Sequence, residues 1–426
     1  MKTKDRDPLN LASVVVFRNI TVLTCAQIGL YLIPWVTLLY LLRVLGTEVW
    51  GRLVLAQLII AWFCTATAWG FPWTITQKVS ANRDDPACLR KTLSVLWWAQ
   101  LLLALASTMA LFGLTYAIPL LRQDSTMYLF GAAVIISGII FPTHYLSGLE
   151  RMFEVALVQL LSRLGGLGAI VLFVQSAADA PLVIAITAIS TTVVSLLGLR
   201  VVWKRLELSV QKVNSRDIQI ELKEGLGLMF STGWLSFQSV LIPLVLGQTS
   251  GATAVGIFAL ADRIRTGAQS VLGPLLQATY PRSSYLWRHD LQIAKNFSNR
   301  LLVVITIIGT LISLLFWFCS EQLVLVIGGA QFSGAADVLR WMAPIPLLAG
   351  LTNFFGVQIM ISRGRVRPFN LILFLGSCFC ALSVYPLIIW QEAVGAALTL
   401  LILEFVIAIG AGIFVYRQRL LSLPPA

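Results

Sequence analysis

Twelve runs of about 20 apolar residues follow one another along this chain of 426 residues. A helix needs roughly 20 such residues to cross the hydrocarbon core of a bilayer. Each run is therefore expected to form one transmembrane helix. The runs are Ile20–Leu42, Leu53–Trp73, Leu93–Leu114, Met127–Leu149, Phe153–Val174, Pro181–Trp203, Leu226–Leu246, Ala254–Gln277, Leu301–Phe318, Leu339–Ile361, Phe369–Trp390 and Val394–Tyr416.

Composition excludes a water-soluble enzyme of this length. Hydrophobic residues make up 58% of the chain and charged residues only 12%, whereas soluble domains carry about 25% charged residues. The predicted fold class is an all-α polytopic membrane protein with about 12 transmembrane helices. The chain has two histidines, and most of its six cysteines lie in apolar runs. We therefore expect no metal site, no disulfide framework and no bound cofactor.

The basic residues predict the orientation in the membrane. If the N-terminus is cytoplasmic, 24 of the 31 Lys and Arg residues lie on that side. Four lie on the opposite side and three inside spans. Because cytoplasmic loops of membrane proteins are enriched in Lys and Arg, both termini are expected in the cytoplasm. The net charge of +12 is thus a topology signal, and we expect no nucleic-acid partner.

A polar stretch divides the spans into two groups of six. It runs from Lys204 to Glu224 and predicts an N-terminal lobe of residues 1–205, a cytoplasmic linker of 206–224 and a C-terminal lobe of 225–426. The apolar positions of the linker suit an amphipathic segment that lies on the membrane surface. Two six-helix bundles around a central cavity form a transporter layout, because alternating access needs two bundles that move against each other.

Five ionisable residues lie at membrane depth, where each is costly and calls for a partner or a function. They are Arg163 in the fifth span, Asp262, Arg263 and Arg265 in the eighth, and Glu404 in the twelfth. Asp262 and Arg265 are three residues apart and share one helix face, whereas Arg263 points about 160° away from Arg265. Two interpretations stay open: interhelix ion pairs with Asp262 and Glu404, or arginines that line a substrate path.

At membrane depth the three arginines outnumber the two acids, and this excess of positive charge favours an anionic cargo. Arg18, at the cytoplasmic mouth of the first span, adds a fourth arginine. Guanidinium groups bind phosphate in a bidentate manner, and a water-filled basic cavity spares a diphosphate the cost of crossing lipid. Arg18, Arg163, Arg263 and Arg265 are therefore the candidate substrate-binding residues.

Several motifs, in order along the chain, resemble the Wzx-type polysaccharide transporter (oligosaccharide flippase) family of the multidrug/oligosaccharidyl-lipid/polysaccharide exporter superfamily. Each is short, but together they cover most of the sequence. They are Pro34 followed by Tyr40-Leu-Leu-Arg43-Val-Leu-Gly46 and Gly51, then Gly148-Leu-Glu-Arg151-Met, Val255-Gly-Ile-Phe-Ala-Leu-Ala-Asp262-Arg263 with Pro274 and Tyr280-Pro281-Arg282, and Gly329-Ala-Gln-Phe332 with Leu339-Arg340-Trp-Met-Ala-Pro344.

The resemblance implies a transporter and not an enzyme. Its expected cargo is undecaprenyl-diphosphate-linked oligosaccharide, an O-antigen or exopolysaccharide repeat unit, moved across the bacterial inner membrane. It also implies membrane lipids as surroundings, and a polysaccharide polymerase and a chain-length regulator as partners. Proton or sodium coupling is suspected for such flippases, with Asp262 and Glu404 as the candidate groups.

Two alternatives come from other classes. A membrane-embedded glycosyltransferase or polysaccharide polymerase needs acidic residues or a sizeable loop on the periplasmic face, where this chain has only single acids on short connections. A cation-coupled drug antiporter of the same broad fold is expected to have an acidic cavity and typically an acid in the first span, whereas spans one to four contain no Asp or Glu.

Overall fold

The computed structural model describes residues 8–206, 210–418 and 420, without the side chains of 8–28, 31, 205, 206, 228 and 230–236. Every regular element of the described residues is helical. In order these are α1 Pro8–Ala68, α2 Phe71–Ala81, α3 Pro86–Ala117, α4 Pro119–Arg122, α5 Ser125–Ser137, α6 Thr143–Gly148, α7 Met152–Phe173, η1 Ala177–Asp179, α8 Ala180–Leu206, α9 Ser215–Gln269, α10 Leu272–His289, α11 Leu291–Gly328, η2 Ala330–Phe332, α12 Ala335–Trp341, α13 Ile345–Asn353, the π-helical η3 Phe354–Ile361 and α14 Val366–Arg417.

The helices confirm the all-α multi-span fold. Eight segments of the described residues are long and apolar enough to cross a membrane, and α5 is a shorter apolar helix. Three of the eight are interrupted by non-helical backbone, at Gly46 in α1, at Gly251 in α9 and at Gln391 and Glu392 in α14. Once these three are each divided in two, the segments and α5 agree with the twelve expected spans.

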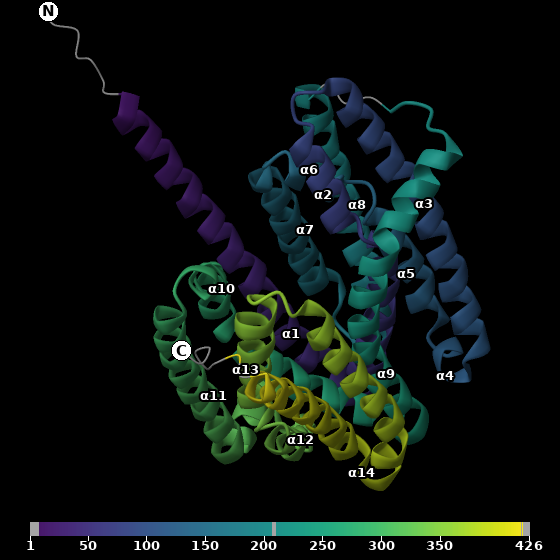
Figure 1. The fold of residues 1–426 in the computed structure, drawn as a ribbon. Coiled ribbons are helices and arrows are strands. Elements are labelled where there is room, and N and C mark those ends of the chain that lie inside the picture. Colours follow the sequence, from purple (N-terminus) through teal and green to yellow (C-terminus); the bar gives the residue numbers. More distant parts are fainter. Residues whose placement is uncertain (1–7, 207–209, 419, 421–426) are drawn as a thin grey trace, which may run out of the picture. The chain divides into compact units, whose positions relative to one another are not determined.

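The chain divides into two compact units. Unit 1 contains Met1–Leu45 and Ala56–Ser236, and unit 2 contains Gly46–Leu55 and Phe237–Ala426. In unit 1, α7 and α8 lie side by side and α5 packs against α8 (Figure 1). The core of this unit gathers buried apolar side chains from α2, α3 and α6, among them Phe71, Ile75, Leu93, Leu96 and Leu146.

The fourth expected span, 127–149, is broken in two. Helix α5 ends at Ser137, the chain turns through residues 138–142, and α6 begins at Thr143 after Pro142. Proline fixes its own backbone and disfavours helix in the residue before it, which explains the break. As a result α6 packs against α2, where Thr76 Oγ1 donates a hydrogen bond to the His144 carbonyl oxygen at 3.1 Å.

The start of α9 packs on the core of unit 1. Ile218 and Leu222 lie against the apolar cluster of that unit, and Glu221 is buried. Lys78 Nζ lies 2.6 Å from an oxygen of Glu221 and 2.6 Å from an oxygen of Glu224. Ile218 and Leu222 therefore cover protein, whereas Val210 and Ile220 of the same stretch are exposed.

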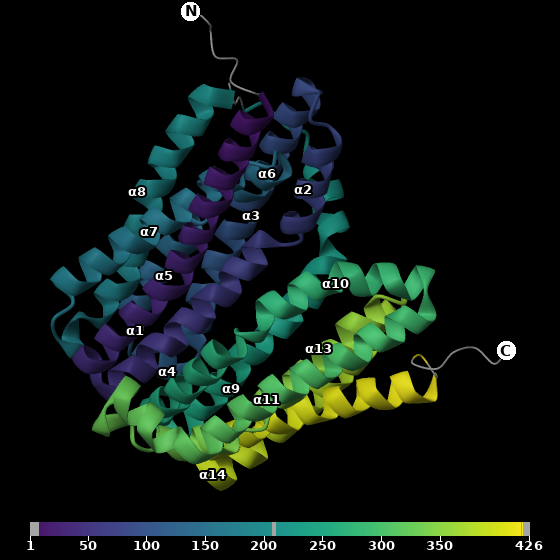
Figure 2. The ribbon, with the colours of Figure 1, turned by 90° about the vertical axis from the view of Figure 1, so that its left-hand side faces the viewer.

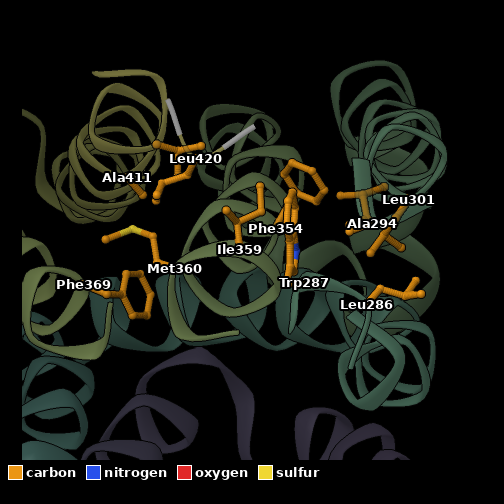
Figure 3. Close-up of a cluster of buried hydrophobic side chains, with 12 residues drawn as sticks. Leu286, Trp287, Ala294, Leu301, Phe354, Ile359, Met360, Phe369, Ala411 and Leu420 are labelled. Carbon is orange, nitrogen blue, oxygen red and sulfur yellow. The ribbon is translucent and has the colours of Figure 1, made fainter. Parts of the chain in front are cut away.

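Unit 2 is built around α11, α13 and α14, with α13 packed on both of the others (Figure 2). Figure 3 shows one of its cores, in which Trp287 of α10 lies beside Phe354 and Ile359 of the π-helix η3. The guanidinium of Arg363 lies over the Trp287 ring, 5.0 Å from the centroid. Gln358 of the same π-helix is fully buried and donates to the Leu276 carbonyl oxygen at 2.9 Å.

Two hairpin turns of unit 2 share the same sequence pattern and backbone. Gly46 and Gly251 both adopt a positive φ, 74° and 83°, with extended ψ values of 176° and 175°. Five residues after each lies a second glycine, Gly51 or Gly256. A positive φ is rare for side chains with a Cβ, so the first glycine of each pair permits the turn.

The second glycine of each pair allows the two turns to touch. A Cβ added at Gly51 would lie 1.9 Å from the Ala252 carbonyl oxygen, and one added at Gly256 would lie 2.1 Å from the Thr47 carbonyl oxygen. Gly51 of the first turn thus lies against Ala252 of the second turn, and Gly256 of the second turn lies against Thr47 of the first. The contact is reciprocal, as in a two-fold interface, and small residues of this kind permit close helix approach in membranes.

Candidate functional site

The ionisable residues of α9 form the centre of the candidate site in unit 2. Asp262 and Arg265 lie one helical turn apart, and Oδ1 of Asp262 accepts from Nε of Arg265 at 2.9 Å and from Nη2 at 2.6 Å. The remaining terminal nitrogen, Nη1, donates to Oε1 of Gln269 at 2.7 Å. Spacings of three and four residues place these side chains on one helix face. The pair is therefore formed within one helix and not between helices.

A second carboxyl lies close to this pair. Glu404, on the second half of α14, is half-buried, and its carboxyl interacts electrostatically with the Arg265 guanidinium. Asp262 and Glu404, the two candidate coupling residues, thus both lie near one guanidinium. The charge of Arg265 is compensated locally.

A cavity of about 440 Å³ opens beside Arg265 in unit 2. Its polar wall is formed by Arg265, Thr266, Gln269 and Ser270 of α9 and its C-terminal end, and by Asn353 of α13. Pockets of about 300–1,000 Å³ are the usual size for small-molecule sites. This volume is therefore large enough for a small organic group.

Arg263 differs from Arg265 in both exposure and pairing. Its side chain is exposed, and among the described residues no acid lies within ion-pair distance of its guanidinium. The wall of the cavity includes Arg265 but not Arg263. Of the two arginines of the expected eighth span, Arg263 is the one whose charge remains available to an anion.

Arg163 lies on α7 in unit 1 and contacts the first span. Its Nη1 donates a hydrogen bond to the carbonyl oxygen of Leu30 in α1. Pro34 lies four residues after Leu30 inside that helix. Because proline has no N–H, the Leu30 carbonyl lacks the usual helical donor, and the Arg163 guanidinium supplies one. Arg163 therefore pairs with backbone and not with an acid.

The remaining candidate, Arg18, falls on helix α1, but its side chain lies outside the described residues. The structure thus brings Asp262, Arg265 and Glu404 together in unit 2, with Arg263 on the same helix. Arg163 and the Arg18 position belong to unit 1. Within the described parts of the chain, no group of three His, Cys, Asp or Glu residues is placed to hold a metal ion.

Sequence reasoning missed Gln269, Ser270 and Asn353. Gln269 follows Arg265 by four residues, and this spacing on a helix could have indicated the contact. Asn353 comes from a helix about 90 positions further along the chain, and its side-chain oxygen is buried without a partner among the described residues. No local pattern in the sequence indicates that it lines the same cavity as Arg265.

Comparison with known proteins supports the fold and identifies the family. Two relatives carry the name "Putative O-antigen transporter". The one from Escherichia coli (strain K12) is 26% identical over 416 residues, which cover 97% of this chain and 100% of the relative. The one from Shigella dysenteriae is 23% identical over 399 residues, covering 92% of this chain and 98% of the relative.

Solved structures show the same fold. The lipid II flippase MurJ in an inward closed conformation aligns with a TM-score of 0.75 at 11% identity, over 95% of this chain and 88% of that one. An inward-facing multidrug resistance MATE family transporter of the MOP superfamily aligns with a TM-score of 0.70 at 15% identity, over 94% of each chain. The profile of the family described as "Polysaccharide biosynthesis protein" matches residues 16–287. Since that match covers well over half of the chain, the chain belongs to the polysaccharide biosynthesis protein family.

Proposed function

We propose that the chain flips an undecaprenyl-diphosphate-linked oligosaccharide, an O-antigen or exopolysaccharide repeat unit, from the cytoplasmic to the periplasmic leaflet of the bacterial inner membrane. Alternating access between an N-terminal lobe of residues 1–205 and a C-terminal lobe of 225–426, joined by the linker 206–224, opens a cationic cavity to one side at a time. Support for the cargo comes from the two relatives named as O-antigen transporters, which align over nearly their whole lengths.

The observation that carries the mechanism is the exposed guanidinium of Arg263 on an apolar helix. A charge at membrane depth costs about 2.5–3.5 kcal/mol on insertion scales, and no acid of the described residues offsets this one. An anionic cargo offsets that cost while it is bound. Arg263 is thus proposed as the principal diphosphate ligand, with Arg18, Arg163 and Arg265 as further cargo contacts.

Asp262 and Glu404 are proposed as the groups that couple transport to protons or sodium. Both lie near Arg265, so a change in the charge of either carboxyl changes how strongly that guanidinium is held. We further propose that both termini are cytoplasmic, and that a polysaccharide polymerase and a chain-length regulator receive the flipped cargo.

Complementation tests the role of Arg263. In a strain lacking the gene, Arg263→Ala should abolish surface polysaccharide while its membrane level, measured by immunoblot, stays normal. Arg263→Lys should restore part of the activity, because it keeps the charge but loses the bidentate geometry. Arg216→Ala is the matched control, since Arg216 is also an exposed arginine of α9. Wild-type polysaccharide from Arg263→Ala would refute the proposed diphosphate contact.

Neutralising the Asp262–Arg265 pair, first in part and then completely, tests the role of Arg265 separately. Arg265→Gln leaves Asp262 without its partner and should be inactive for that reason alone. In the double variant Asp262→Asn/Arg265→Gln no uncompensated charge remains in the pair. Because Asp262 is also a proposed coupling group, the readout is binding of the lipid-linked cargo and not transport. If Arg265 contacts cargo, the double variant binds it weakly; if Arg265 only neutralises Asp262, binding returns and Arg265 is removed from the cargo contacts.

The alternative activities have less support. The full-length alignment with relatives named as transporters argues against a membrane-embedded glycosyltransferase or polymerase. The likeness to a multidrug transporter concerns the fold, and one fold can host different cargoes. No contact in the described residues favours a drug over a lipid-linked anion.

A further inference from the structure

The cavity beside Arg265 offers no free charge to a diphosphate. Among the described residues that line it, Arg265 carries the only charge, and its guanidinium already pairs with Asp262 at 2.6 Å. A phosphate that entered would have to compete with the Asp262 carboxylate for the same N–H groups. The cavity is therefore suited to a neutral group.

The polar wall of the cavity consists of groups that hydrogen-bond without charge. Thr266 and Ser270 carry hydroxyls, and Gln269 and Asn353 carry amides. Arg265 has five N–H donors, of which three are used by Asp262 and Gln269. Two donors remain. They lie beside the hydroxyls of Thr266 and Ser270, which already donate to the carbonyl oxygens of Asp262 and Gly267 and so can accept from a ligand. The side-chain amides of Gln269 and Asn353 can donate.

Asn353 contributes an unsatisfied hydrogen-bond acceptor to this wall. Its Oδ1 is buried and has no hydrogen-bond partner among the described residues. Buried polar atoms are almost always paired with protein, water or a ligand. Oδ1 itself is covered by protein, but the side chain also lines the cavity, so a turn of the amide group brings Oδ1 within reach of a ligand hydroxyl that enters there. Such a hydroxyl is at once a donor for Asn353 and an acceptor for the free N–H groups of Arg265.

Small residues leave room for a ring beside this polar wall. Gly273 lines the cavity, and a Cβ built on it would meet no atom within 4 Å. Ala349 and Gly350 line another part of the wall. A compact molecule that carries several hydroxyls and no charge fits this combination of donors, acceptors and open space. A sugar ring has that chemistry.

We propose that this cavity is a sugar subsite, which binds one glycosyl residue of the lipid-linked cargo, and that Ser270, Asn353 and Gly273 determine which sugars are accepted. The inference rests on the proposed function. It assigns the diphosphate to Arg263 and the glycan to the Arg265 cavity, so the two arginines of α9 recognise different parts of one molecule. Sites that hydrogen-bond a hydroxyl discriminate strongly against ligands that lack it, because their polar groups are then left unpaired.

Binding to the purified full-length protein in nanodiscs tests the subsite. The probes are farnesyl diphosphate and the same lipid bearing one N-acetylglucosamine or one galactose. The measured quantity is the sugar ratio, the Kd of the bare lipid divided by the Kd of the glycosylated lipid. In the wild-type protein at least one sugar should give a ratio of about ten or more, which corresponds to about 1.4 kcal/mol.

Two variants should remove the sugar contribution alone. Asn353→Ala deletes a hydrogen-bonding group, and Gly273→Leu adds an apolar side chain at a cavity-lining position where the new Cβ meets no atom within 4 Å. Both should lower the ratio to about one while the Kd for farnesyl diphosphate stays unchanged. Arg263→Ala should weaken all three probes and keep the ratio. Asn370→Ala, an exposed asparagine of α14 in the same unit, is the control.

The outcomes separate the two proposals. A wild-type ratio of one for both sugars, or ratios that persist in Asn353→Ala and Gly273→Leu, would overturn the sugar subsite and leave the proposed cargo class standing. Weaker binding of farnesyl diphosphate in Gly273→Leu would place the diphosphate in this cavity and overturn the subsite as well. A wild-type protein that binds none of the three probes would overturn the proposed function itself.

Discussion

Replacing Gly51 by alanine should destabilise unit 2 through the contact between its two hairpin turns. The new Cβ would lie 1.9 Å from the Ala252 carbonyl oxygen, whereas real Cβ atoms essentially never approach closer than 3.0 Å. The two backbones must therefore separate by about 1.1 Å to reach even the tightest contact that proteins show. Both partners are backbone atoms, so no side-chain rotation can relieve the clash.

The magnitude follows from two opposing effects. Overpacking of this kind costs about 1–3 kcal/mol, and a backbone partner argues for the upper end. Alanine in place of glycine inside a helix gains about 1 kcal/mol. The expected net loss is about 2 kcal/mol. With an unfolding entropy of about 2.1 cal/mol/K per residue, the melting temperature should fall by about 2 °C if the whole chain melts together, and by about twice that if unit 2 melts alone.

Thermal melting of detergent-solubilised protein, followed by intrinsic fluorescence, measures this effect. Gly113→Ala in α3 is the matched control, because a Cβ there meets no atom within 4 Å and its backbone is helical. That variant should melt at or above the wild-type temperature. Gly256→Ala should behave like Gly51→Ala, since its Cβ would lie 2.1 Å from the Thr47 carbonyl oxygen. If the melting temperature of Gly51→Ala equals that of Gly113→Ala, the reciprocal contact between the two turns is absent from the folded protein.

Three further predictions concern other parts of the chain. Arg163→Ala should lower the free energy of unfolding by about 1–2 kcal/mol in the wild-type background but by little in a Pro34→Ala background, where the alanine N–H donates to the Leu30 carbonyl. A double-mutant cycle of melting temperatures measures the difference. Equal losses in the two backgrounds would count against the carbonyl contact. Arg83 lowers the pKa of the exposed Glu150 carboxyl through a hydrogen bond. The resulting stabilisation of the folded state is present above pH 4.5, the ordinary pKa of a glutamate, and is lost as the pH falls through the lowered pKa of the folded protein. The melting temperature of Glu150→Gln should therefore decline less steeply than that of the wild type between about pH 6 and about pH 3. Alkaline phosphatase fused after residue 122 should be active and fused after residue 216 inactive, and the reverse result would invert the proposed orientation.

The number of spans could be predicted from the sequence because each apolar run has to satisfy its own backbone hydrogen bonds within the membrane. Their internal breaks were harder to place. Pro142 in the fourth span explains the break once the structure is known, but the packing of α6 on α2 depends on residues about 70 positions apart. The reciprocal turns show a pattern that was readable in part, since Gly46 and Gly51 have the same spacing as Gly251 and Gly256.

The candidate site was predictable only along single helices. The Asp262–Arg265 pair follows from a spacing of three residues, and the structure confirms it at 2.6 Å. The surplus positive charge, in contrast, was assigned to three arginines together. Arg265 has a carboxylate partner and Arg163 has a carbonyl partner. Of these three arginines, Arg263 is therefore the one that has no partner among the described residues and can bind an anion. Residues that reach the site from other helices, such as the cavity-lining Asn353 and the Leu30 carbonyl that pairs with Arg163, cannot be identified from the local sequence.

The bond between Arg163 and the carbonyl freed by Pro34 affects how genetic data on this chain should be interpreted. A screen for lost transport would recover Arg163 whether or not cargo ever touched it, because its removal leaves a backbone oxygen in the first span without a donor. The two positions are also expected to covary among homologues. Sequences that lose the proline are freed from keeping the arginine, and those that retain the arginine alone are the ones in which its contact with cargo can be studied by itself.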